Sequence, residues 1–244
     1  MLNAKKVTAD IINWIKDYFD KNANPKTKAV IGISGGKDSS IVAALCVKAL
    51  GKDRVFGVLM PNGVQHDIDV SYELCKTLEI AYVEINIKNT VKALYDELTG
   101  AGLKLNNVAT FNTPARVRMT TLYAVSAVVG GRVSNNSNLS EDYVGYATKF
   151  GDSVGDFSPL SNLTVTEVKA IGRELGLDSK FVDKVPIDGL CGKTDEDNLG
   201  FSYDTLDKYI REGICEDQSI KDKIDAMHKN NQHKFMPMPA FGLK

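Results

Sequence analysis

The chain has 244 residues, of which 43% are hydrophobic, and its 30 basic and 31 acidic side chains leave a formal charge of −1 at pH 7. This composition excludes disordered and fibrous proteins. The charge balance offers no basic surface of the kind that binds nucleic acid or anionic lipid, so neither is expected as a partner. No segment approaches the roughly 20 apolar residues that a membrane span requires.

The four cysteines stand apart from one another in the sequence: Cys46, Cys75, Cys191 and Cys215. They form no CxxC pair and no cluster with histidine, which argues against a zinc site, an iron–sulfur site or a disulfide framework. We therefore expect free thiols in a reducing compartment and a cytoplasmic location.

Hydrophobic periodicity predicts alternating helices and strands in the first half of the chain. The expected elements are a helix at 3–20, a strand at 29–33, a helix at 39–50, a strand at 55–60, a helix at 67–78 and a strand at 82–87. Strands that alternate with helices in this way predict an α/β fold, a Rossmann-like parallel β-sheet with helices on both faces.

The second half of the chain is less regular. Residues 98–112 lose periodicity and are rich in glycine and asparagine, which predicts a mobile loop. The remaining expectations are a helix from Thr113 to about 129, a short strand at Val133, a polar loop at 134–141, helices at 164–176 and 202–212, and a Lys-rich tail. With no repeat and no linker, residues 1–244 are expected to form a single domain.

A glycine-rich turn between the first strand and the next helix is the sharpest signal. It comprises Gly32, Ile33, Ser34, Gly35, Gly36, Lys37, Asp38 and Ser39. Adjacent glycines bring backbone N–H groups close to phosphate oxygens, and a helix N-terminus adds free N–H groups and a positive dipole end. The spacing differs from the P-loop of kinases and GTPases. Asp38 among phosphates implies an intervening Mg²⁺, although a plain glycine turn with a helix cap would also place an aspartate there.

This SGGxDS string resembles the phosphate loop of the ATP pyrophosphatase family, which cleaves ATP between its α- and β-phosphates and adenylates a substrate. The resemblance implies Mg-ATP bound at the carboxyl ends of the strands. It also implies that Met60, at the end of the second strand, and Asn136, where many members have an ATP-contacting threonine, belong to the ATP site.

Longer motifs resemble the ammonia-dependent NAD synthetases. They are NTPARVRM at 112–119, SNLSE at 137–141, GYATKFGD at 145–152 with a following aspartate, and GKTDEDNLGFSY at 192–203. The resemblance implies that Glu141 is the second Mg²⁺ ligand beside Asp38. It further implies that Arg116, Lys149 and Asp156 contact the dinucleotide, and that His233 and Lys234 form a substrate clamp in the tail.

The resemblance also implies a reaction. ATP adenylates the carboxylate of nicotinic acid adenine dinucleotide (deamido-NAD), and ammonia then displaces AMP to give NAD. A loop must keep water from the adenylate, and we expect residues 88–112 to do so. We expect no glutaminase domain within 244 residues, so the nitrogen comes from free ammonia or a separate glutaminase subunit. A homodimer is also implied.

Two positions depart from the family pattern. Val165 replaces a lysine that contacts ATP, and Ile187 replaces a serine or threonine. A missing lysine leaves phosphate charge uncompensated during adenylation. We hypothesise that Lys37 or Lys193 neutralises it and acts, with Asp38, in catalysis.

Three alternatives remain open. The chain could adenylate and amidate another carboxylate, which competition assays with deamido-NAD would test. It could be a nucleotide-binding module without turnover, although the retained carboxylates argue against this. A tRNA-sulfurating enzyme is disfavoured, because it would need paired cysteines and a basic surface.

Overall fold

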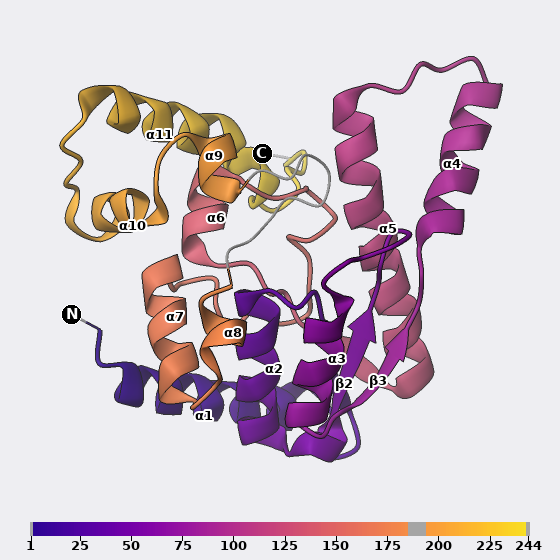
Figure 1. Ribbon diagram of the computed structural model, residues 1–244, viewed down its shortest axis with the longest axis vertical. Helices are drawn as coiled ribbons and strands as arrows, with labels where there is room; N and C mark the ends of the chain where they lie inside the picture. Colours follow the sequence, from indigo (N-terminus) through magenta and orange to yellow (C-terminus); the bar gives the residue numbers. More distant parts are fainter. Residues whose placement is uncertain (1, 185–193, 243–244) are drawn as a thin grey trace.

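A four-stranded parallel sheet organises the molecule (Figure 1), and the computed structural model describes residues 2–184 and 194–242 of it. The strand order is β3-β2-β1-β4. The strands are β1 Lys28–Gly32, β2 Val55–Leu59, β3 Ala81–Glu84 and β4 Gly131–Val133. Val30 of β1 pairs with Phe56 on one side and with Val133 on the other. The predicted α/β class with a parallel sheet is confirmed.

The described part of the chain contains eleven α-helices. They are α1 Ala4–Asn22, α2 Lys37–Leu50, α3 Ile68–Thr77, α4 Lys88–Gly100, α5 Asn107–Val129, α6 Leu139–Val144, α7 Val165–Glu174, α8 Ser179–Val182, α9 Asp195–Leu199, α10 Tyr203–Glu212 and α11 Gln218–Asn231. The predicted helices near 3–20, 39–50, 67–78, 164–176 and 202–212 are therefore present, with ends shifted by a few residues.

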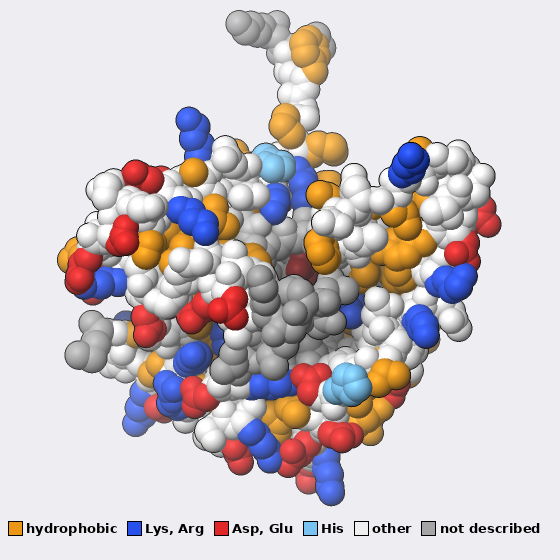
Figure 2. Space-filling view, turned by 45° about the horizontal axis from the view of Figure 1, so that its top comes forward, with side chains coloured by type: hydrophobic (Ala, Val, Ile, Leu, Met, Phe, Trp, Pro, Cys, Tyr) orange, Lys and Arg blue, Asp and Glu red, His pale blue; other side chains and the backbone are white. Residues whose placement is uncertain are grey.

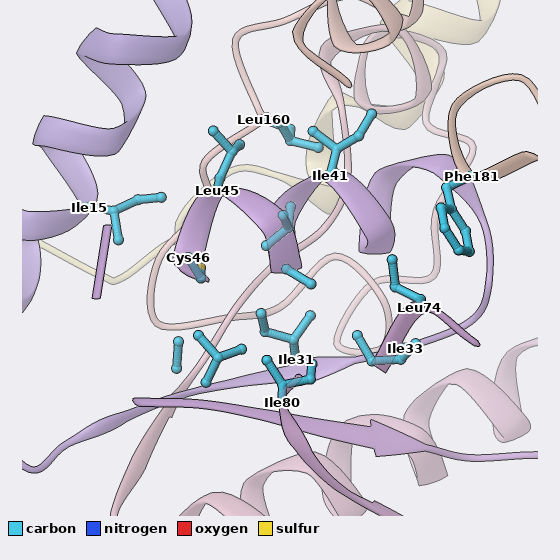
Figure 3. Packing of buried hydrophobic residues seen from close by; sticks show 14 of the residues in the cluster. Ile15, Ile31, Ile33, Ile41, Leu45, Cys46, Leu74, Ile80, Leu160 and Phe181 are labelled. Atoms are coloured by element: carbon cyan, nitrogen blue, oxygen red, sulfur yellow. The ribbon is translucent and has the colours of Figure 1, made fainter. Parts of the chain in front are cut away.

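Helices cover both faces of the sheet, as predicted. Ile31 of β1 is fully buried together with Ile41 and Leu45 of α2 and Ile15 of α1 (Figure 3). Successive side chains of a strand point to opposite faces, and the neighbouring Val30 belongs to a separate cluster that includes Val91 of α4 and flanking residues of α5. The sheet is thus buried on both faces, which explains its continuous apolar strands.

A third apolar cluster lies away from the sheet and joins α6, α9, α10 and α11. Val144, Leu199, Leu206 and Ile224 are almost fully buried in it. Helix α11 was not predicted, because its apolar residues are few among lysines and asparagines. The tail therefore contains a packed helix that supports α6.

The expectation of loop structure throughout 98–112 and 88–112 is wrong, because most of both segments is helical, and the closing role of this segment stays a prediction. Helix α4 occupies 88–100 and α5 begins at Asn107, with Asn106 as its N-cap. Pro114 therefore lies inside α5 rather than at its start. Proline cannot donate to the carbonyl four residues earlier, which is that of Thr110. The Tyr95 hydroxyl of α4 donates to that carbonyl at 3.0 Å instead.

Two smaller boundaries also differ from expectation. The polar loop at 134–141 ends at Asn138, where α6 begins. Strand β3 ends at Glu84, although the chain continues beside β2 through a bond from Ile85 N–H to the Leu59 carbonyl.

Helix α4 and the first half of α5 form an arm that projects from the sheet (Figure 1). Hydrophobic side chains gather on its surface (right in Figure 2), among them Leu94, Val108 and Phe111, which are 43%, 66% and 51% exposed. Over the residues described, none of the helices has the length and apolar character needed to cross a bilayer.

Candidate active site

The glycine-rich turn connects the carboxyl end of β1 to α2. Gly35 has φ +78°, a left-handed conformation that favours glycine, and an added Cβ there would lie 2.9 Å from Ser71 Oγ. Hydroxyl groups brace the turn. Ser34 Oγ accepts from Gly36 N–H at 3.2 Å and lies 3.1 Å from Ser39 Oγ, and Ser40 Oγ donates to the Gly36 carbonyl at 2.8 Å. These bonds fix the conformation of the turn.

The first turn of α2 has no side-chain cap within the described chain, and Gly36 is its N-cap. The first N–H groups of a helix lack intrahelical partners, and they carry the positive end of its dipole. The turn and the helix end together provide a binding site for phosphate oxygens.

Two carboxylates and one ammonium group meet beside this turn. Lys37 Nζ lies 2.9 Å from Asp38 Oδ2 and 3.5 Å from Glu141 Oε1, and the lysine side chain is only 4% exposed. Burial alone would lower the pKa of Lys37, but the two carboxylates outweigh it and raise the pKa above its usual value. Loss of hydration, and then the Asp38 charge, raises the pKa of Glu141, and the nearby Lys37 opposes that shift.

Asn138 connects the two carboxylate-bearing helices. Its side chain is fully buried, donates from Nδ2 to Asp38 Oδ1 at 3.1 Å, and accepts at Oδ1 from Glu141 N–H at 3.1 Å. The second bond caps α6. One amide thus orients Asp38 and also the helix turn that carries Glu141.

Two further residues, Tyr203 and Asp195, lie near Lys37. The ring of Tyr203 lies with its centroid 5.7 Å from Lys37 Nζ, and its hydroxyl donates to Asp195 Oδ2 at 3.4 Å. Burial, then the Glu141 charge, raises the pKa of Tyr203, so the phenol stays protonated. Desolvation raises the pKa of Asp195, and the nearby Lys37 opposes that shift. Both residues lie in the quoted GKTDEDNLGFSY motif, but no role was assigned to either.

The carboxylate pair has the chemistry of a magnesium site. Mg²⁺ prefers oxygen ligands and is usually held by one or two carboxylates together with substrate phosphates. Asp38 and Glu141 converge on a single positive charge beside the phosphate turn. Two carboxylates would suit the ion together with substrate phosphates, and over the described residues no group of three or more histidine, cysteine or acidic side chains is arranged to hold a metal by itself.

The other residues expected to bind ATP surround the same turn. Ile33 is buried and its N–H donates to the Val58 carbonyl at 2.9 Å. Met60 is 8% exposed at the end of β2. The Asn136 amide donates to the Gly32 carbonyl at 3.1 Å, which links the end of β4 to the start of the turn.

Four of the five residues expected to bind the dinucleotide lie together. Arg116 Nε donates to the Lys149 carbonyl at 3.2 Å, and Lys149 Nζ donates to the His233 carbonyl at 2.7 Å. Lys234 Nζ donates to the carbonyls of Gly145 and Ala147 at 2.7 and 3.0 Å. The tail thus meets the GYATKFGD segment, although these residues are more than eighty positions apart.

Asp156 lies apart from that group. It accepts from Val133 N–H at 2.7 Å and from the Tyr123 hydroxyl at 3.3 Å, and within the described chain no hydrogen bond joins it to Arg116, Lys149 or the tail. It lines a recess of about 440 Å³ beside β4, whose other walls are Ala23, Asn24, Thr27, Tyr123, Ser126, Ala127, Gly130, Gly131 and Arg132.

The departures from the family pattern have different outcomes. Val165 is 3% exposed in the third apolar cluster, so its side chain is a core residue. Lys193 and Ile187 lie outside the described residues, as does Cys191.

Lys184, which the sequence did not single out, forms an ion pair with Asp67. Its Nζ is 3.5 Å from the position of a Cβ added to Gly35, so a further positive charge borders the turn.

The fold and this turn define a protein with a Rossmann-like parallel sheet and a glycine-rich turn suited to phosphate oxygens at the carboxyl edge of that sheet. A family model described as NAD synthase matches residues 7–238. The chain therefore belongs to the NAD synthase family, and the resemblance drawn from the motifs is confirmed.

Individual relatives agree with this assignment. The chain is 38% identical over 247 residues to an NH(3)-dependent NAD(+) synthetase of Pyrococcus furiosus, covering 96% of this chain and 93% of that protein. An NH3-dependent NAD synthetase from Campylobacter jejuni, solved with nitrate ion, superposes with a TM-score of 0.80 at 27% identity, over 99% of this chain and 100% of that one. NMN synthetase from Francisella tularensis superposes with a TM-score of 0.90 at 30% identity, over the full length of both.

Proposed function

We propose that this protein is an ammonia-dependent NAD synthetase that converts deamido-NAD, ATP and ammonia into NAD, AMP and pyrophosphate. The observation that carries the proposal is the convergence of Asp38 and Glu141 beside an open phosphate turn. This arrangement occurs in a member of the NAD synthase family. Such an enzyme is a ligase that forms a C–N bond.

The chemistry needs no protein nucleophile. A carboxylate oxygen of deamido-NAD attacks the α-phosphorus of ATP, and the bond to the bridging oxygen breaks to release pyrophosphate. Ammonia then attacks the acyl carbon, loses a proton, and AMP departs with the electron pair of the broken C–O bond. The protein contributes position and charge compensation.

Each group of residues has a proposed part in this reaction. The N–H groups of the turn and of α2 bind the phosphates, and Arg116, Lys149, His233 and Lys234 bind the dinucleotide, with Asp156 as a further proposed contact. Asp38 and Glu141 would hold Mg²⁺, which supplies neutralisation of the phosphate charge when bound.

The phosphate-neutralising lysine is a separate question. Lys37 and Lys193 remain our candidates, and the position of Lys184 beside Gly35 adds a third. Lys37→Met, Lys193→Gln and Lys184→Met should be compared by kcat for pyrophosphate release. A variant that keeps the full kcat removes its lysine from the list of candidates.

A second candidate function is amidation of the corresponding mononucleotide. It is favoured by the superposition with NMN synthetase, which covers both chains completely with a TM-score of 0.90. That substrate, nicotinate mononucleotide, presents the same carboxylate but lacks the adenylate half of the dinucleotide. The same adenylation site would serve both substrates.

One assay separates the candidates. Pyrophosphate release and amide formation are followed with Mg-ATP and ammonium, using deamido-NAD or nicotinate mononucleotide as acceptor. We expect kcat/KM to be at least tenfold higher with deamido-NAD. A reversed preference would establish the mononucleotide as substrate, and ATP binding without pyrophosphate release from either would reject catalysis.

Assembly and location are proposed from the family resemblance. We propose that free ammonia or a separate glutaminase subunit supplies the nitrogen to this catalytic domain. Activity with ammonium but not with glutamine alone would support this. We also propose a homodimer in the cytoplasm, where a reducing environment suits the free Cys46 and Cys75.

A further inference from the structure

The Lys37 side chain fills the space between the two proposed metal ligands. Its nitrogen is 2.9 Å from Asp38 Oδ2 and 3.5 Å from Glu141 Oε1, and the side chain is 4% exposed. Lysine is rarely buried to this extent unless its charge is paired. The face of Tyr203 provides a third contact. The carboxylate pair therefore already has a cation, supplied by the chain itself.

An ion from solvent and the Lys37 ammonium compete for the same oxygens. Mg²⁺ binds carboxylate oxygens at about 2.0–2.1 Å. An ion held by Asp38 and Glu141 would therefore lie close to Lys37 Nζ, which is 2.9 Å from Asp38 Oδ2 and 3.5 Å from Glu141 Oε1. Two positive charges so close together, in a site largely shielded from water, repel each other strongly. The ammonium must move before a divalent cation can bridge the pair.

Bound nucleotide offers the displaced ammonium a new partner. Lys37 is the first residue of α2, and its backbone belongs to the helix end that faces the phosphate site. The side chain can therefore exchange a carboxylate for a phosphate oxygen while it remains paired. Without nucleotide no such anion is present, and leaving the carboxylates would strand a buried positive charge.

We propose that Lys37 is an exchangeable counter-ion that excludes free divalent cations from Asp38 and Glu141 and releases both carboxylates only when ATP arrives with its metal. This inference rests on the proposed function, because it takes these two residues as ligands of the cation of Mg-ATP. It also explains how the fold tolerates two adjacent carboxylates before substrate binds. The Lys37 charge compensates theirs, and both remain available to bind the metal of Mg-ATP.

The test measures Mn²⁺ binding to the full chain without nucleotide, by the loss of the free-ion electron paramagnetic resonance signal. Mn²⁺ shares the oxygen preference of Mg²⁺. We expect the wild type to bind weakly and Lys37→Met to bind at least about tenfold more tightly, since the repelling charge is gone. The double variant Lys37→Met, Glu141→Gln should lose that gain. Lys52→Met, which removes an exposed lysine paired with Glu79, is the matched control and should bind as the wild type does.

Three results would overturn the inference. They are tight Mn²⁺ binding by the wild type without nucleotide, Lys37→Met binding no tighter than the wild type, and a gain that survives Glu141→Gln. If Lys37→Met does not fold, Lys37→Gln is measured in its place. The wild-type titration does not depend on the folding of any variant. The proposed function is tested separately by the wild-type pyrophosphate assay. If the protein makes NAD but gives one of these three Mn²⁺ results, only the proposal that Lys37 is an exchangeable counter-ion is rejected.

Discussion

At the scale of single residues, the buried amide of Asn138 positions two carboxylates, those of Asp38 and Glu141. Its Nδ2 reaches Asp38 and its Oδ1 caps the turn that carries Glu141. Neither carboxylate is near the other in sequence, so their alignment depends on this bridge. Asn138 touches no reacting group, and we regard it as a positioning residue.

We predict that Asn138→Asp lowers kcat/KM for Mg-ATP at least about tenfold. The new carboxylate retains the oxygen that caps α6, but it removes the donor to Asp38 and places a negative charge beside it. The midpoint of the Mg²⁺ dependence should also shift, which a merely structural role would not require. Asn3→Asp is the matched control, since Asn3 caps α1 with the same geometry on the surface. Unchanged Mg²⁺ dependence in Asn138→Asp would contradict the assignment.

The cysteines give a prediction about pH. Burial raises the pKa of Cys75 to about 11 and raises that of the fully buried Cys46 as well. A raised pKa keeps a thiol protonated at neutral pH, and the thiolate is the reactive form. We expect iodoacetamide at pH 8 to modify Cys215, which is partly exposed, and to leave Cys46 and Cys75 unmodified. Peptide mass spectrometry checks each site, and rapid labelling of Cys75 in the folded protein would show the prediction to be wrong.

At the scale of elements, the short helix α6 depends on its neighbours. It has six residues, too few to be stable alone, yet it carries Glu141. Ser140 of α6 donates to Asp207 of α10, and Asp207 also accepts from Thr166 N–H at 2.7 Å at the start of α7. The Ser140 hydroxyl in turn accepts from Val165 N–H at 3.0 Å. A single buried carboxylate therefore joins three helices.

We expect Asp207→Ala to reduce the free energy of unfolding by about 3 kcal/mol, because it removes two hydrogen bonds to a charged acceptor and leaves the buried Ser140 hydroxyl without its acceptor. Urea denaturation measures this loss. Asp204→Ala, on the exposed side of the same helix, should change stability by less than about 0.5 kcal/mol. Equal stability of the two variants would contradict the proposal that Asp207 joins α6, α7 and α10.

At the scale of the whole molecule, the arm of α4 and α5 is the feature that departs most from a compact α/β domain (Figure 1). Hydrophobic side chains gather on this arm in Figure 2. Met238 and Phe241 of the terminal segment are also exposed. Such surface is unusual on an isolated monomer.

We therefore expect sedimentation equilibrium at micromolar concentration to give twice the chain mass of 26.6 kDa. Burial of exposed apolar surface would provide the driving force, as in other homodimers. A monomer that retains full activity would contradict the homodimer and any contribution of a second copy to the site.

The sequence by itself determined the sheet, the phosphate turn and the family. Buried β-branched strands at 29–33 and 55–60 and the turn at 32–39 depend on short stretches of chain, whose periodicity and glycine pattern are legible locally. The carboxylates could be chosen because their residue types suit a metal and their motifs are long. Helices α4 and α11 were missed, because sparse apolar residues become a helix face only when a neighbouring cluster is present to bury them.

Only the tertiary structure decided how the site residues meet. The hypothesis that Lys37 or Lys193 neutralises the phosphates did not include the position of Lys37 between two carboxylates, which follows from the folding of α6 against α2 by way of Asn138. Contacts between distant segments also decide where Tyr203 and Lys184 lie. They likewise separate Asp156 from Lys149. Local sequence specifies backbone conformation, whereas the charge that surrounds a side chain is specified by every element packed against it.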